Sequence, residues 1–153
     1  MILFLDASAF LKLYVAEPGS GALRRAVKNA TAVFAVDRTY VEVRATLERA
    51  AQLGLVRARS AGQAKGDFER DWQAVSVVAP DTPMLRRAAD LAEAHRLDPS
   101  HAINVAAAET LARQIGGAVS FRMATAVLPD AVTSPLAIQV LDLSERSGPA
   151  GAS

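Results

Sequence analysis

The chain has 153 residues, of which 51% are hydrophobic and 22% are charged, and its net charge is +1. A chain of this length and composition folds as one globular domain, which excludes an intrinsically disordered protein. The near-neutral charge indicates no overall preference for nucleic acid, and the lack of cysteine excludes disulfides and thiolate metal sites. Because no apolar run reaches the roughly 20 residues of a membrane-spanning helix, we expect a cytoplasmic protein with no membrane contact.

The first predicted element is a short buried strand over residues 1–5, which ends at Asp6. Five successive apolar side chains are too few for a helix, and the apolar residues that follow Asp6 take up helical spacing. In open α/β sheets, ligands bind beyond the carboxyl ends of the strands. An acid at this place is therefore a candidate site residue.

Strands and helices are predicted to alternate along the rest of the chain. Short apolar segments with strand character lie at 31–36, 75–78, 118–121 and 138–141. Segments with helical periodicity or composition lie at 22–29, 39–53, 60–72, 82–95 and 100–113.

This alternation predicts a three-layer α/β/α sandwich with a mainly parallel central sheet. Residues 1–146 are interpreted as one domain, 129–135 as a loop region and 147–153 as a flexible tail. Thr82 before Pro83 and Asp98 before Pro99 are each typical of a helix N-cap followed by the first helical residue.

Three carboxylates occupy comparable places in the predicted fold. Asp6 follows the first strand, Glu42 lies in the helix after the second strand, and Asp98 begins the alanine-rich helix. Because strand-to-helix junctions share one edge of a parallel sheet, Asp6 and Glu42 are expected at the same rim, whereas Asp98 follows a helix and is placed less directly. Oxygen ligands of this kind suit Mg²⁺ or Mn²⁺.

Each of these acids also has a purely structural interpretation. Thr39 and Glu42 fit a capping box, in which the glutamate returns a hydrogen bond to the cap residue. Asp6 and Asp98 fit ordinary N-caps of the helices that follow them. The two interpretations are compatible, because the N-terminus of a helix favours an ionised carboxylate.

Three blocks of sequence carry a family resemblance. The first is LDASAFLKLY over residues 5–14 with EPGS over 17–20, the second is YVEVR over 40–44, and the third is LDPSH over 97–101 leading into three alanines at 106–108. In order and spacing these blocks resemble the PIN-domain family, specifically the VapC-type toxins of toxin–antitoxin pairs. The resemblance covers nearly the whole chain.

The resemblance implies a metal-dependent endoribonuclease in which Mg²⁺ or Mn²⁺ helps water to attack RNA. Asp6, Glu42 and Asp98 are implied as the catalytic, metal-binding acids, with Ser8 as a supporting hydroxyl beside Asp6. The implied partners are an RNA substrate, a small VapB-like antitoxin protein and a second copy of the chain in a homodimer.

One segment departs from the family pattern. The family usually carries a fourth acid just after the fourth strand, in a segment like Val-Thr-x-Asp, whereas this chain has Val-Ser-Phe-Arg at 119–122. Ser120 keeps a supporting hydroxyl, but Arg122 stands where the acid belongs. Three carboxylates and one guanidinium sum to −2 and balance a single dication, where four carboxylates would balance two. Asp130 is an alternative fourth acid, but its loop gives no register. His101 is interpreted as a packing or hydrogen-bonding residue rather than a metal ligand.

Three basic residues, Lys12, Arg44 and Arg122, are candidates for contacts to RNA phosphates, with a solvated surface charge as the alternative for each. Because of Arg122, a second function stays open, namely a catalytically impaired PIN fold that serves as a binding or regulatory module. Phosphotransfer is a third function class. It is disfavoured because the segment 6–8 has serine where a second acid is needed and no suitable lysine follows the fourth strand.

Overall fold

The computed structural model describes residues 1–117, 119–123 and 139–142 of the chain. The loop region predicted over 129–135, with Asp130, and the predicted tail over 147–153 lie outside the described residues. The elements are β1 (Ile2–Leu5), α1 (Ala7–Tyr14), α2 (Ser20–Asn29), β2 (Ala32–Val36), α3 (Arg38–Gln52), α4 (Ala58–Trp72), β3 (Ser76–Val78), α5 (Thr82–His95), α6 (Pro99–Ile115), β4 (Val119–Met123) and β5 (Gln139–Asp142).

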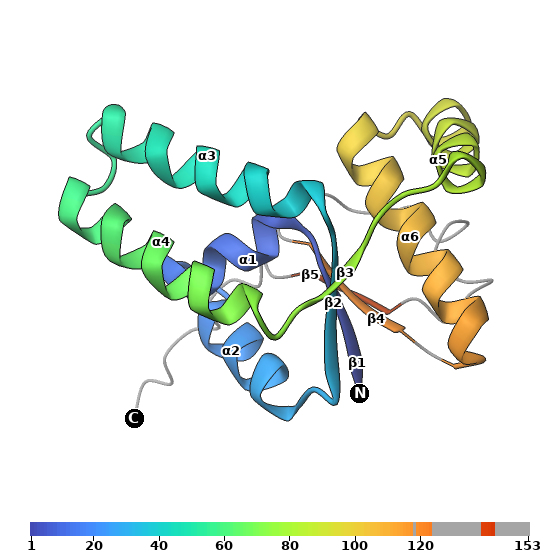
Figure 1. Cartoon of the computed structure of the whole chain (residues 1–153), viewed down its shortest axis with the longest axis horizontal. Helices are drawn as coiled ribbons and strands as arrows, with labels where there is room; N and C mark the ends of the chain where they lie inside the picture. The colour runs from blue at the N-terminus through green and yellow to red at the C-terminus, as the bar shows by residue number, and fades with distance from the viewer. Residues whose placement is uncertain (118, 124–138, 143–153) are drawn as a thin grey trace, which may run out of the picture.

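The described strands form one five-stranded sheet in the order β3-β2-β1-β4-β5, and every neighbouring pair is parallel. Helices α1 to α4 cover one face of this sheet, and α5 and α6 cover the other (Figure 1). The predicted three-layer α/β/α class is confirmed. No helix within the described ranges combines the length and the apolar character that crossing a membrane requires.

The central strand β1 shows why a continuous apolar run is needed here. Successive side chains of a strand point to opposite faces of its sheet. Ile2 and Phe4 accordingly pack with the α5–α6 side, whereas Leu3 and Leu5 pack with the α1–α4 side. A strand covered on both faces therefore has no polar position until it ends at Asp6.

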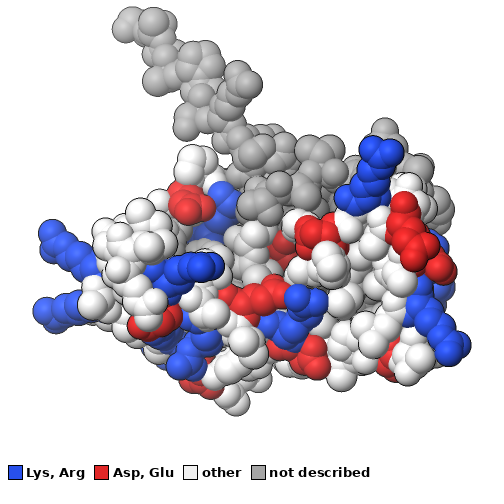
Figure 2. Space-filling view, turned by 90° about the horizontal axis from the view of Figure 1, so that it is seen from above, with Lys and Arg blue, Asp and Glu red and all other residues white. Residues whose placement is uncertain are grey.

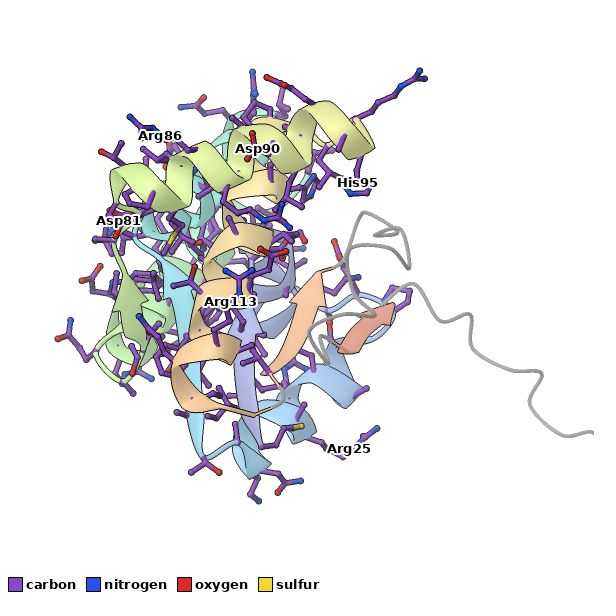
Figure 3. All side chains as sticks on the ribbon, turned by 90° about the vertical axis from the view of Figure 1, so that its right-hand side faces the viewer. Arg25, Asp81, Arg86, Asp90, His95 and Arg113 are labelled. Carbon is purple, nitrogen blue, oxygen red and sulfur yellow. The ribbon has the colours of Figure 1, made fainter. Side chains whose placement is uncertain are left out.

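Helix α6 packs closely on the sheet because small side chains fill its buried face, including Ala102 and the three alanines at 106–108. Its one buried acid, Glu109, has a side chain only 1% exposed and is held by Arg87 of α5, with Nε to Oε2 at 2.8 Å and Nη2 to Oε1 at 2.9 Å. Figure 3 shows α5 lying across α6, with Asp81 and His95 near opposite ends of α5 and Arg113 near the end of α6. The Arg87–Glu109 ion pair joins α5 to α6.

Two helix N-caps differ from those that the sequence predicts. The N-cap of α5 is Asp81 rather than Thr82, and its side chain accepts a hydrogen bond from the Met84 N–H at 2.9 Å. A carboxylate stabilises the positive end of a helix more strongly than a hydroxyl does, and one added residue places it at the cap. Helix α3 begins at Arg38, so Thr39 is already inside it rather than at the cap.

Candidate active site

A cavity of about 360 Å³ lies where the N-terminal ends of α1 and α6 meet the first turns of α3. We call it the acidic cavity. In Figure 1, β1 runs upward from the N-terminus, and Figure 2 looks down onto the edge where the strands end. Acidic side chains gather near the middle of that face, and many of its basic side chains project at the two ends (Figure 2). The polar residues that line the cavity are Asp6, Ser8, Glu42, Thr46, Ser100, His101 and Asn104.

Asp6 is the most buried acid of the cavity, at 3% exposed. As the N-cap of α1 it accepts the Ala9 N–H on Oδ1 at 2.8 Å, and the Ser8 hydroxyl lies 2.7 Å from Oδ1 and 2.9 Å from Oδ2. Burial raises the pKa of Asp6 to about 6, and the charge of Glu42 adds to the rise, against the lowering effect of these hydrogen bonds. The cap interpretation is confirmed, and Ser8 contacts Asp6 as expected.

Glu42 reaches the same cavity from the second turn of α3. Its Oε1 atom accepts two hydrogen bonds, from Arg38 Nε at 2.7 Å and from the Ser100 hydroxyl at 3.0 Å. The capping-box interpretation of Glu42 is therefore wrong, because its carboxylate points toward α6 instead of back to Thr39. The prediction that Asp6 and Glu42 meet at one rim agrees with this geometry.

Asp98 is not among the residues that line the acidic cavity, although Ser100 and His101, which it contacts, are. It caps α6 instead, where Oδ1 accepts the Ser100 N–H at 3.0 Å and the His101 N–H at 3.1 Å. Its other oxygen, Oδ2, pairs with Nδ1 of His101. These contacts to the N–H groups of the second and third residues of α6 are those of an N-cap.

His101 and Asn104 are the side chains that α6 turns toward the cavity, together with Ser100. Burial lowers the pKa of His101, and the charge of Glu42 opposes this effect. His101 lies on the cavity wall and pairs with Asp98 through Nδ1, which agrees with the hydrogen-bonding role expected of it.

Asn104 was missed by the sequence analysis. It is 1% exposed, its Nδ2 donates to the Ser100 carbonyl at 3.0 Å, and its Oδ1 has no hydrogen-bond partner within the described part of the chain. A buried polar atom without a partner is costly unless water or a ligand satisfies it. The available signal was an asparagine one turn after His101 in a helix whose other buried positions are mostly alanine.

Two of the predicted RNA-binding residues are already engaged elsewhere. Lys12 is 8% exposed, and its Nζ donates to the Pro18 carbonyl at 2.9 Å and to Glu17 at 3.3 Å. Arg44 donates from Nη1 to the Tyr40 hydroxyl at 2.9 Å and to Glu69 at 3.0 Å. Lys12 thus fixes the turn after α1, and Arg44 links α3 to α4.

Arg122, which stands where the family pattern has an acid, lies on β4 next to the strand that ends at Asp6. In the parallel register of β1 and β4, Ser120 is opposite Leu3 and Arg122 is opposite Leu5. Arg122 therefore lies near the edge of the sheet from which Asp6 emerges, because its register partner Leu5 is the residue before Asp6. Arg122 lies within β4, whereas the sequence analysis expected this position just after the fourth strand.

Known proteins resemble this chain in both sequence and structure. The family model described as PIN domain matches residues 3–116. Two curated relatives from Mycobacterium tuberculosis, ribonuclease VapC45 of strain CDC 1551 / Oshkosh and ribonuclease VapC49 of strain ATCC 25618 / H37Rv, are each 32% identical over 107 residues. Each match covers 70% of this chain and 74% of the relative.

Three solved structures share the fold at low sequence identity. VapC20 of Mycobacterium tuberculosis, described as a sarcin-ricin loop cleaving toxin, has a TM-score of 0.59 at 17% identity, over 90% of this chain and 98% of its own. A toxin–antitoxin complex from Klebsiella pneumoniae has a TM-score of 0.63 at 12% identity, over 94% and 99%. VapBC2 of Rickettsia felis, bound to a DNA fragment from its promoter, has a TM-score of 0.60 at 7% identity, over 93% and 98%. The chain belongs to the PIN-domain family and, within it, to the VapC-type ribonuclease toxins.

Proposed function

We propose that this protein is an endoribonuclease that cuts RNA at the acidic cavity with the help of one divalent cation. The observation that carries the proposal is the meeting of two carboxylates from separate helices, Asp6 and Glu42, at one cavity beside the unpartnered Oδ1 of Asn104. RNA as the substrate class is supported by the relatives that are named ribonucleases.

The side-chain oxygens of Asp6, Glu42 and Asn104 suit a single hard cation. Within residues 1–117, 119–123 and 139–142, no three His, Asp or Glu side chains are grouped so as to hold a metal ion. Mg²⁺, however, is commonly bound through one or two carboxylates while it keeps several waters. Asp6 and Glu42 supply two negative charges, and the Asn104 amide oxygen adds a neutral ligand of the right kind. A bound dication supplies Lewis acidity, which lowers the pKa of water and stabilises charge on a phosphoryl oxygen.

The chain's own residues hold this donor set in place. Asp6 is fixed by the Ser8 hydroxyl and by a backbone N–H, and Glu42 is fixed through Oε1 alone, by Arg38 and Ser100. Oε2 of Glu42 accepts no hydrogen bond from any described residue, so it is the oxygen left for a cation. Side chains that are already oriented need no reorganisation when the substrate arrives. We assign Asp98 to a supporting role, as the cap of α6 and the partner of His101, instead of a ligand role.

The test is cleavage of a labelled RNA by the purified protein with Mg²⁺ or Mn²⁺, compared with Asp6→Asn and Glu42→Gln. We expect both variants to lose at least 100-fold in rate, because an amide cannot replace the charge that a carboxylate offers a cation. Asp81→Asn is the matched control, since Asp81 caps a different helix outside the cavity. Cleavage that survives both cavity substitutions would contradict the proposed site.

The register of Arg122 beside Leu5 favours a second function, a PIN fold whose activity is impaired and which acts as a binding or regulatory module. A guanidinium at this edge adds positive charge where a cation is to bind. The two functions are separated by the same assay. RNA that stays intact with either metal, but is cut by Arg122→Asp, supports the module.

We further propose that a small VapB-like antitoxin neutralises the protein and that the protein forms a homodimer. The antitoxin is supported by two structural neighbours, a toxin–antitoxin complex and a VapBC2 complex. An apolar hollow of about 200 Å³ between α1, α3 and α4, lined by Leu47, Val56 and Ala61 among others, offers such a partner an apolar seat. Multi-angle light scattering of the chain alone and with its antitoxin measures both stoichiometries.

A further inference from the structure

We propose that Arg38 is the residue that binds an RNA phosphate at the acidic cavity, a role the sequence analysis gave to other basic residues. This inference rests on the proposed ribonuclease function and names one contact of its substrate. The need for such a contact is electrostatic. Without a bound metal ion, two carboxylates repel a polyanion, and a basic side chain close to them offsets part of that repulsion.

Arg38 is a cation that the structure places next to one of these acids. It donates to Glu42, which lines the acidic cavity. Lys12 and Arg44 make their contacts with other residues, as described above. The field of Glu42 therefore holds a guanidinium at the cavity even before substrate binds.

The contact to Glu42 leaves most of the guanidinium free. Nε donates to Glu42 Oε1 at 2.7 Å, and the four N–H groups on Nη1 and Nη2 have no partner among the described residues. The Arg38 side chain is 39% exposed, so its outer edge is open to solvent. A guanidinium carries five donors in a planar fork, and the outer pair matches two oxygens of a phosphate.

The same geometry gives Arg38 a second task, which is to orient Glu42. Arg38 and Ser100 both donate to Oε1 and so fix the plane of the carboxylate, with Oε2 left without a described donor. Arg38 is then a positioning residue for Glu42 and a contact residue for RNA. Because the two tasks use different atoms, Nε for one and Nη1 with Nη2 for the other, different measurements separate them.

The experiment measures RNA binding without cleavage, by fluorescence anisotropy of a labelled single strand in EDTA over a series of salt concentrations. The variants are Arg38→Gln, Arg38→Lys and the control Arg86→Gln. Arg86 is exposed on α5 (Figure 3) and is not among the residues that line the acidic cavity. We expect Arg38→Gln to weaken binding about tenfold and to reduce the slope of log affinity against log salt by about 0.7–1, the loss of one phosphate contact.

Arg38→Lys should keep the salt slope, because the charge remains. It should lose part of the RNA affinity, because lysine lacks the planar guanidinium that contacts two phosphate oxygens. Arg86→Gln should change neither quantity. Wild-type affinity and slope in Arg38→Gln would overturn the proposal, and so would a slower cleavage rate with unchanged RNA binding, which would leave only the positioning task. A wild-type protein that neither binds nor cuts RNA would overturn this inference together with the proposed function, whereas normal cutting with unchanged binding in Arg38→Gln would overturn this inference alone.

Discussion

Asp6 carries opposing demands, because it caps a helix, lies buried and shares a cavity with Glu42. Burial and the second charge raise its pKa from 3.8 to about 6. The folded state then binds a proton that the unfolded state has released, so the stability of the metal-free protein falls as pH rises from about 4 to about 6. Above that window the ionised carboxylate costs about 3 kcal/mol, at 1.36 kcal/mol for each pKa unit. Asp6 is thus a residue kept at the expense of stability.

Asp6→Asn should therefore stabilise the protein in EDTA. The amide keeps an acceptor for the Ala9 N–H but carries no charge to desolvate. Urea unfolding should show the variant more stable than wild type by about 2–3 kcal/mol at pH 7.5, with the difference shrinking toward zero at pH 4. Asp81→Asn, at an exposed cap, should not reproduce this pattern. A wild-type protein that equals or exceeds the variant at pH 7.5 would show that the carboxylate is not penalised by burial.

Helix α6 follows Asp98, which is either only its N-cap or also a metal ligand. Asp98 accepts two backbone N–H groups of the first turn, so Asp98→Ala should cost about 1 kcal/mol in unfolding free energy, whereas Asp98→Asn should cost only a few tenths. Calorimetric titration with Mn²⁺ then separates capping from ligation. If Asp98 only caps α6, Asp98→Asn binds Mn²⁺ as wild type does, while Glu42→Gln does not. A large loss of affinity in Asp98→Asn would restore the ligand role that the sequence analysis gave it.

The pairing of α5 with α6 depends on a carboxylate that is nearly inaccessible. Removing Arg87 leaves Glu109 at 1% exposure with only the longer contact to Arg113 at 3.5 Å. Arg87→Ala should cost about 3 kcal/mol, since a buried charge without its partner is strongly unfavourable. Glu109→Gln should cost less, because Arg87 is 43% exposed and water can solvate it. Arg86→Ala, on the neighbouring exposed residue, is the control for thermal or urea unfolding, and equal costs for the three variants would contradict this account.

The order and type of the elements follow from local patterns, and the cavity wall does not. An apolar run such as Ile2–Leu5 has few alternatives to a buried strand, and the parallel arrangement then brings Asp6 and Glu42 to one edge. Asp98 differs because it follows a helix, and the direction of a side chain at a helix start depends on whether it caps. His101 and Asn104 reach the cavity through the rotation of α6 against the sheet, which is set by alanine packing over the whole helix. Long-range packing of this kind leaves no local signature.

For the whole molecule, the main question is how strongly a fold of this family, with arginine at its fourth strand, still binds a cation. Asp6 and Glu42 balance one dication, and the register of β1 with β4 places Arg122 at the edge of the sheet from which Asp6 emerges. If a guanidinium lay about 5 Å from a dication, an effective dielectric constant of about 20 would give a repulsion of roughly 7 kcal/mol.

Arg122→Asp should therefore raise the Mn²⁺ affinity at least tenfold in calorimetry and increase RNA cleavage in parallel. Arg122→Gln, which removes the positive charge without adding a ligand, should fall between the variant and wild type. A gain confined to the aspartate would mean that the missing ligand, and not the added charge, limits the site. An equal gain in both variants would mean that repulsion limits it. Unchanged affinity in both would mean that Arg122 does not act on the cation, and the activity of the wild-type chain would then be set by Asp6 and Glu42.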